Sequence, residues 1–161
     1  MDFHISGTTV GDDKIVSQLG VVVEDGSDFR PAWTPVHKIL IKGVRFEFRT
    51  EGQGSGGWMK LNPKYRRQKR KRYGNKTILR REDELWKSLT DPNHDNHIFI
   101  PARQHMSFGS ADPNAARHHF GIPSINLPSR KMVVLTDNMR RDILKELQSH
   151  IFKRLNYTPG S

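Results

Sequence analysis

Residues 28–48 read DFRPAWTPVHKILIKGVRFEF, and their apolar side chains recur every three or four positions. That spacing predicts a helix of about 20 residues with one apolar face. The apolar face consists of Phe29, Trp33, Val36, Leu40 and Val44. Asp28 is a candidate N-cap and Pro31 suits the first turn, whereas Pro35 implies that the helix starts later than Asp28 or bends there. Such a helix needs a second layer to cover its apolar face.

Segments on both sides of that helix carry strand patterns. Residues 3–10 alternate loosely between apolar and polar and predict a short strand, whereas residues 15–23 are apolar and fit either a helix or a strand. Residues 97–100 and 106–109 predict the two strands of a hairpin. Residues 131–135 predict a third strand or an extended approach to the C-terminal helix.

Further helical patterns follow the first helix. Residues 63–73 predict a basic helix with a proline in its first turn, preceded by a flexible glycine-rich segment over residues 52–57. Residues 111–119 predict a short helix that Gly121 closes. Between these two lies a short amphipathic helix whose apolar residues are Leu85, Trp86 and Leu89.

The C-terminal helix has the most regular pattern in the chain, and it starts at a cap, Thr136 or Asp137. Its apolar face consists of Ile143, Leu144, Leu147, Ile151 and Leu155. The elements together predict an α+β fold: long N-terminal and C-terminal helices around a small antiparallel sheet, with a basic helical insertion. We expect one domain over residues 1–161, with an acidic strand and extension at residues 1–28 and a frayed tail at residues 156–161.

The composition predicts a thin core and charged partners. Only 34% of the 161 residues are apolar, 27% are charged, and the net charge is +10. A charge of this size favours nucleic acid, an anionic membrane or an acidic protein as partner. The absence of cysteine excludes disulfides, thiolate zinc sites and cysteine nucleophiles. There is neither a signal-peptide pattern nor an apolar run long enough to span a bilayer, so we expect a soluble protein with no membrane partner.

The charge is concentrated in the middle of the chain. Residues 60–81 contain eleven Lys or Arg and no Asp or Glu, whereas residues 1–28 contain six acids and the single cation Lys14. Identical subunits could therefore pair head to tail. The candidate contacts to nucleic acid or to a partner are Lys64, Arg66, Arg67, Lys69, Arg70, Lys71 and Arg72, with Tyr65 and Tyr73 available to stack on bases. A solvated or partner-facing helix fits the same pattern equally well.

Candidate reactive groups each have a plain structural explanation. His94 and His97 have a spacing that a metal site could use, but their segment is typical of an exposed polar turn. The acids at residues 82–84 lie at a helix start, where they favour the macrodipole. Adjacent His118 and His119 point about 100° apart on a helix and are expected to pack rather than bind one ion. We therefore predict no enzyme activity, catalytic residue, metal or cofactor.

Four groups of short motifs occur in a characteristic order. They are FRTEG and WMKLNPKY within residues 48–65, ILRREDELWKSLT at 78–90, MSFGS and AARHHFG within 106–121, and LPSRKM at 127–132. Together they resemble the phage virion morphogenesis (tail completion) family of tailed phages, over residues 29–155. The chain departs from that family's pattern at Lys131, where a proline is usual, and at Asn114, where a tyrosine is usual.

The resemblance implies a small structural virion protein that completes the tail or joins it to the head. It implies a homo-oligomeric ring around the DNA passage, located at the head–tail joint or tail, assembled in the host cytoplasm and touching other neck, tail or connector proteins. The motif residues with implied interface or structural roles are Trp58, Trp86, Phe108, Phe120, Gly121, Pro128 and Arg130. A stand-alone, nonspecific nucleic-acid-binding protein is the alternative function.

Overall fold

The computed structural model describes residues 4–10, 15–22 and 28–154, and of the side chains in the first two segments it describes only Leu19. Eleven elements follow one another: β1 (His4–Val10), β2 (Ile15–Val22), α1 (Arg30–Thr50), the 3₁₀ turn η1 (Gln53–Ser55), α2 (Pro63–Tyr73), α3 (Glu84–Thr90), β3 (His97–Pro101), β4 (His105–Ser110), α4 (Pro113–Phe120), the 3₁₀ turn η2 (Pro123–Ile125) and α5 (Asp137–Arg154). The predicted α+β class is confirmed. Leu155, the last residue of the predicted C-terminal apolar face, and the tail after it lie outside the described residues.

The strands form one antiparallel sheet in the order β1-β2-β4-β3. The predicted hairpin of β3 and β4 is confirmed, with Phe99 opposite Phe108. The ambiguous segment at residues 15–23 is a strand because it pairs along β4, where Leu19 lies opposite Met106. The N-terminal strands therefore enlarge the sheet beyond the small one that was expected.

Of the two alternatives predicted for residues 131–135, the strand is not formed: the segment has no strand pairing and leads into α5. Strand β2 occupies the side of β4 that β3 leaves open, so the segment has no place beside the hairpin on that side. The segment is anchored through Met132 instead. Its side chain is fully buried, and its N–H donates to His119 Nδ1 at 3.2 Å.

The sheet is the second layer that covers the apolar face of α1. The helix begins at Arg30, whose N–H donates to the Asp28 carboxylate at 3.0 Å, so Asp28 satisfies the helix start although Phe29 occupies the N-cap position. Pro35 lies inside the helix close to its start and does not end it. The buried face is Ala32, Trp33, Val36, His37, Leu40, Ile41, Val44, Glu47 and Phe48.

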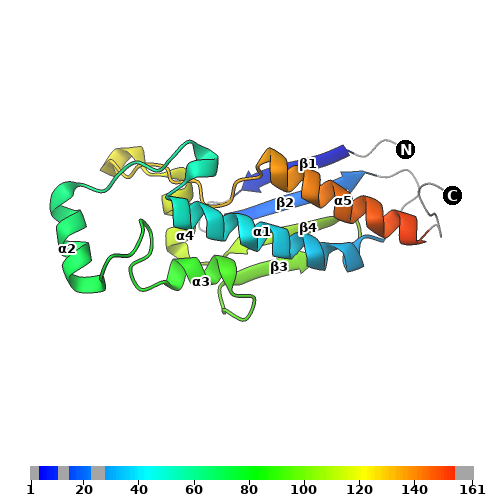
Figure 1. Ribbon diagram of the computed structural model, residues 1–161, viewed down its shortest axis with the longest axis horizontal. Helices are drawn as coiled ribbons and strands as arrows, with labels where there is room; N and C mark the ends of the chain where they lie inside the picture. Colours follow the sequence, from blue (N-terminus) through cyan, green and yellow to red (C-terminus); the bar gives the residue numbers. More distant parts are fainter. Residues whose placement is uncertain (1–3, 11–14, 23–27, 155–161) are drawn as a thin grey trace.

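Helices α1 and α5 run side by side across the same face of the sheet (Figure 1). Helix α5 buries Ile143, Leu147 and Ile151. The start of α1 is also tied to α5, because His150 Nε2 lies 2.8 Å from the Asp28 carbonyl oxygen. The core thus lies between the sheet and this helix pair.

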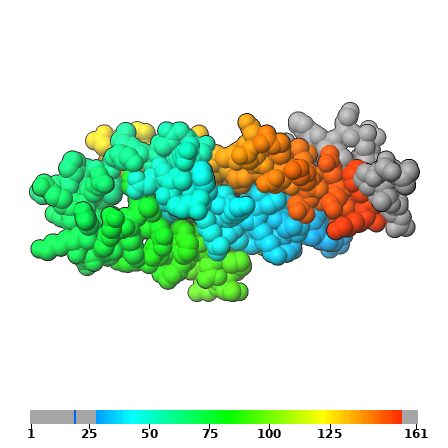
Figure 2. Space-filling model, in the orientation of Figure 1, coloured from blue at the N-terminus to red at the C-terminus, as the bar shows by residue number. Residues whose placement is uncertain are grey.

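Helix α2 lies apart from that core, at one end of an elongated molecule (Figures 1 and 2). Its bounds, Pro63–Tyr73, are those predicted from the sequence, and Lys69 is its only buried residue. The predicted basic helical insertion is therefore confirmed as a projection that adds nothing apolar to the core.

The glycine-rich segment between α1 and α2 is a packed turn, so the expectation of a flexible linker is wrong. Gly52 has φ +89°, and a Cβ on it would collide with the Trp58 ring. The Gly57 N–H donates to the Gly52 carbonyl at 2.7 Å, and the Trp58 N–H to the Glu51 carbonyl at 2.7 Å. Glycine is needed here because the backbone must turn directly against the Trp58 ring.

Candidate functional site

Residues 60–81, which we call the basic lobe, consist of α2 and the segments that connect it to the body. Helix α2 starts where Asn62 Oδ1 accepts the Lys64 N–H at 2.9 Å, and it ends at Gly74, which has φ +77°. Local signals alone therefore define the helix. Six of the seven predicted contact residues are exposed on it: Lys64, Arg66, Arg67, Arg70, Lys71 and Arg72.

Lys69 is the exception, because its side chain is buried rather than exposed. It is 6% exposed, and its Nζ donates to the carbonyl oxygens of Lys76 at 2.7 Å and Thr77 at 2.6 Å. Burial lowers the pKa of Lys69. Lys69 thus ties α2 to the chain segment that returns from it.

Glu51, at the end of α1, anchors both connecting segments of the basic lobe. Its carboxylate pairs with Lys60 Nζ at 2.9 Å and accepts the Ile78 N–H at 3.0 Å. Burial would raise the pKa of Glu51, but the hydrogen bonds from Lys60 and Ile78 outweigh it and lower that pKa. Ile78 itself is buried in the core. The lobe is therefore fixed to the body rather than loosely tethered.

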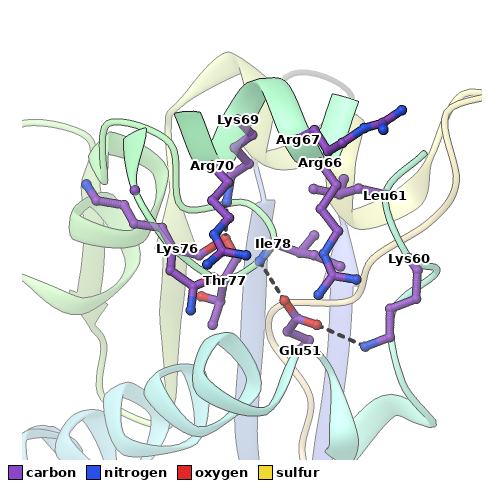
Figure 3. Close-up of a pocket in the computed structure, with 12 residues that line it drawn as sticks. Glu51, Lys60, Leu61, Arg66, Arg67, Lys69, Arg70, Lys76, Thr77 and Ile78 are labelled. Carbon is purple, nitrogen blue, oxygen red and sulfur yellow. Dashed lines mark hydrogen bonds and ion pairs between the residues drawn. The ribbon is translucent and has the colours of Figure 1, made fainter. Parts of the chain in front are cut away.

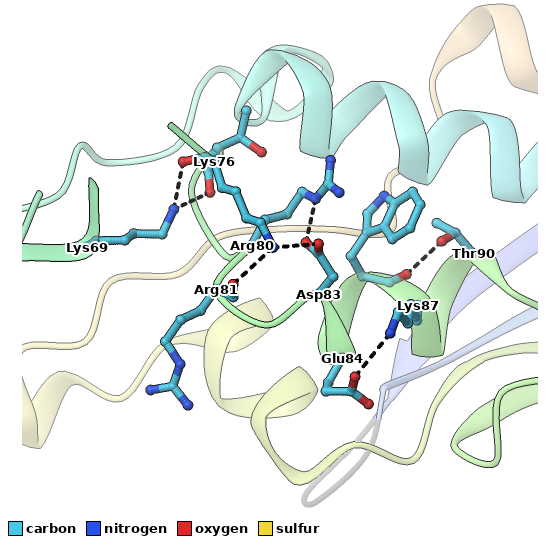
Figure 4. A network of polar contacts seen from close by, with 10 residues as sticks. Lys69, Lys76, Arg80, Arg81, Asp83, Glu84, Lys87 and Thr90 are labelled. Carbon is cyan, nitrogen blue, oxygen red and sulfur yellow. Dashed lines mark hydrogen bonds and ion pairs between the residues drawn. The ribbon is translucent and has the colours of Figure 1, made fainter. Parts of the chain in front are cut away.

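Asp83 supplies a second anchor (Figure 4). Its carboxylate lies 2.8 Å from both Lys76 Nζ and Arg80 Nε, and the hydrogen bond from Arg80 is the main cause of its lowered pKa. The Arg80 guanidinium also lies 4.5 Å from the centroid of the half-buried Trp86 ring. The acids at residues 82–84 do not all serve the helix start as expected, because the Asp83 side chain makes no cap hydrogen bond.

A pocket of about 370 Å³ lies between α2 and the returning segment (Figure 3). It is lined by Glu51, Lys60, Leu61, Arg66, Arg67, Lys69, Arg70, Gly74, Asn75, Lys76, Thr77 and Ile78. Arg66 and Arg70 extend from α2 toward Glu51, whereas Arg67 points to the side. The lining holds six cations against one carboxylate, so the pocket favours an anion.

A larger pocket of about 590 Å³ shares Leu61 and Lys69 with the first and reaches α3 and α4. Its charged lining is mixed: Lys69, Arg81, Glu82, Asp83, Glu84, Asp112, His118 and Arg130. His118 Nδ1 is buried there without a hydrogen-bond partner. Because its lining contains side chains of both charge signs, this pocket has no clear ligand class.

The motif residues Trp58 and Arg130, on either side of α2 in the sequence, are mainly structural. The Trp58 indole N–H donates to the Lys131 carbonyl at 2.9 Å, and the ring packs edge-on against Phe48. Arg130 is 5% exposed, and its guanidinium donates twice to the Met59 carbonyl, at 3.1 and 3.3 Å. These contacts join residues 58–59 to residues 130–131, which no local sequence signal indicates.

The remaining motif residues divide between core and surface. Phe108 is fully buried, whereas Phe120 is 45% exposed. Gly121 has φ +76°, and a Cβ there would lie 2.6 Å from the Ser129 nitrogen. Pro128 is half-buried and lines the larger pocket. Of these residues, only Phe120 is available as an exposed apolar contact.

His97 departs from the exposed turn that its sequence suggested. It opens β3, and its Nε2 lies 2.8 Å from Nε2 of His37, which is 6% exposed. Because His97 Nδ1 faces the Ser88 carbonyl at 2.9 Å, that nitrogen carries a proton, and His97 Nε2 accepts from His37. His94 instead lies 3.3 Å from Glu84, and His119 is buried as predicted. The described residues contain no group of three metal-binding side chains.

No family model, curated protein or solved structure matches this chain. None of the helices in the described part of the chain has both the length and the apolar character that a bilayer crossing requires.

Proposed function

We propose that this protein is a structural virion component of a tailed phage that completes the tail or joins it to the head. It acts as a ring of identical subunits around the DNA passage, without catalytic activity, and touches neighbouring neck, tail or connector proteins. The observation that supports this most is the basic lobe, which is anchored at Glu51 and Asp83 and carries its exposed cations away from the core. A fixed projection of this kind suits contact with a partner outside the subunit.

Exposed apolar side chains support an assembled state. Met59, Ile100 and Ile125 are 60–67% exposed, and Tyr65 and Phe120 are a little under half exposed. Aromatic residues and Met are enriched in protein interfaces, where they become buried on association. Subunit contacts would cover these side chains and complete a core that the composition leaves thin.

The same basic lobe also supports the alternative, a protein that binds nucleic acid nonspecifically and acts alone. Arg66, Arg67 and Arg70 make no side-chain hydrogen bond or ion pair with another described residue. The alternative predicts a monomer that binds duplex DNA tightly and with a steep salt dependence.

Electron microscopy of the purified full chain separates the two functions. The proposed function predicts closed rings with a central opening, formed by the protein alone or on incubation with purified tails that lack it. Particles the size of one subunit that coat DNA irregularly would contradict it and favour the alternative.

A further inference from the structure

We infer that the pocket beneath α2 binds phosphate groups of a nucleic-acid backbone, with Arg66 and Arg70 as the main contacts. This deepens the proposed function and depends on only one part of it, the contact with nucleic acid. It does not require that the subunits form a ring.

Two arginines of α2 point into the pocket. Arg66 and Arg70 are four residues apart on α2, so they share one face of the helix, and Figure 3 shows both side chains extending into the pocket. Lys60 approaches from the opposite wall, and Arg67 lies at the side of the pocket. Donors from two chain segments therefore converge on one space.

Only some of the cations that line the pocket are free to bind a ligand. Lys60 pairs with Glu51, Lys76 pairs with Asp83, and Lys69 donates to two carbonyl groups. The side chains of Arg66, Arg67 and Arg70 form no hydrogen bond or ion pair with another described residue, although Arg66 lies near enough to Glu51 to act on it electrostatically. Their guanidinium N–H groups are therefore the donors that remain for a ligand.

The walls of the pocket are held in place by contacts within the protein. Lys69 holds α2 against residues 76–77, and the Glu51 carboxylate holds the Ile78 N–H. Because a ligand would not have to order these walls, binding carries only a small free-energy cost for forming the site. The donors are thus arranged before the ligand arrives.

The chemistry favours phosphate over the carboxylates of an acidic protein. A guanidinium donates through a planar fork that matches phosphate oxygens, and a tetrahedral phosphate accepts from several directions at once. The pocket offers forks from two arginines, while the Lys60–Glu51 ion pair forms part of its wall. A phosphodiester group carries its charge on a continuous backbone, so one phosphate enters the pocket while its neighbours meet the exposed cations of α2. The bases are not read, and binding is independent of sequence.

The test compares two double variants that remove the same charge from the same helix. Arg66→Gln with Arg70→Gln removes the pocket donors, whereas Lys64→Gln with Lys71→Gln removes two exposed cations that do not line the pocket. Fluorescence anisotropy of labelled mixed-sequence duplex DNA is recorded at several salt concentrations. We expect the pocket variant to lose about 10-fold or more in affinity and its log–log salt slope to fall by about 1 to 2, with a clearly smaller effect of the control variant.

Equal losses in the two variants would overturn the inference, because net charge alone would then explain binding. Tighter binding of wild-type protein to polyglutamate than to DNA of equal charge would also overturn it, in favour of an acidic protein partner. Matching circular dichroism melting curves ensure that both variants are folded.

The masses of the same samples separate this inference from the proposed ring. If the wild-type protein stays monomeric even with DNA and purified tails, while the pocket variant binds DNA more weakly than the control variant, the ring proposal ends and the phosphate site stands. If the protein forms rings and both variants bind DNA with equal affinity, the ring proposal stands and the phosphate site is overturned.

Discussion

At the residue scale, Arg130 has the clearest structural role. The family resemblance implied an interface or structural role for Arg130, and the structure directs two of its donors to the Met59 carbonyl while the guanidinium is buried. Arg130→Met should leave that carbonyl unpaired and lower the free energy of unfolding by about 2–3 kcal/mol, as measured by urea denaturation. Arg117→Met, on the exposed side of α4, is the matched control and should change stability by less than about 0.5 kcal/mol. Equal effects would mean that the Met59 contact is unimportant.

Gly121 gives a second prediction at this scale. A Cβ at this position would meet backbone atoms of Leu127 and Ser129 at 2.8 and 2.6 Å, and φ is already +76°. Gly121→Ala should therefore destabilise the fold by about 2–4 kcal/mol in a thermal or urea melt. Gly56 has φ +91°, but no atom lies within 4 Å of the place that a Cβ would take, so Gly56→Ala isolates the backbone strain and should cost about 1 kcal/mol. A Gly56→Ala effect as large as that of Gly121→Ala would contradict the steric explanation.

Buried histidines predict how stability depends on pH. Burial, which disfavours the charged form, is the main cause that lowers the pKa of both His37 and His119 to about 4. As pH falls, the unfolded chain takes up these protons near pH 6.5 while the folded protein stays neutral, so stability is complete above about pH 6.5 and is lost toward pH 4. The loss should reach about 2–3 kcal/mol per histidine.

Urea denaturation at a series of pH values checks this expectation. His119→Gln and His37→Phe should each lower stability at neutral pH and flatten the decline between about pH 6.5 and pH 4. A decline of unchanged steepness in both variants would show that other groups control acid unfolding.

Contacts between distant residues limit prediction at this scale. Lys69 and Lys71 look alike in the sequence, yet Lys69 donates to carbonyl groups of residues 76–77 whereas Lys71 is exposed. Those acceptors depend on where the chain turns back after Gly74. Sequence alone does not separate the two lysines for that reason.

At the element scale, α2 should depend on its anchors. Glu51→Ala removes both the Lys60 ion pair and the acceptor for the Ile78 N–H. Hydrogen exchange should become about 10-fold faster or more at Ile78 and in α2, because the hydrogen bonds lost are worth about 1–3 kcal/mol, while the centre of α1 keeps its protection. Glu82→Ala, which removes a surface ion pair with Arg81, is the control and should leave exchange in α2 unchanged. Unchanged exchange in the Glu51 variant would mean that the lobe is held by other contacts.

Elements with local signals were predictable, and those that depend on pairing were not. Helix α2 has its asparagine cap and terminal glycine within the sequence itself, so its predicted bounds are correct. Residues 15–23 and residues 131–135 are both apolar, but only the former pairs with β4. Whether an apolar segment becomes a strand depends here on which one reaches the open side of the hairpin.

At the scale of the whole molecule, a region with a hydrophobic core is joined at one end to the basic lobe, which projects exposed cations. The sheet with α1 and α5 holds the core, and the basic lobe lies beyond it with exposed cations (Figure 2). The sheet also ends in two edge strands, β1 and β3. Edge strands and exposed apolar side chains are features that neighbouring subunits commonly cover. The net charge predicted a charged partner, but only the structure locates the pocket where unpaired arginines converge.

The mass of the purified full chain in solution tests the central proposal most directly. Sedimentation equilibrium over a wide concentration range, with and without short duplex DNA, should give a defined multiple of the 18.6 kDa subunit, as a closed ring requires. A mass of one subunit at every concentration, unchanged when DNA or purified tails are added, would contradict it.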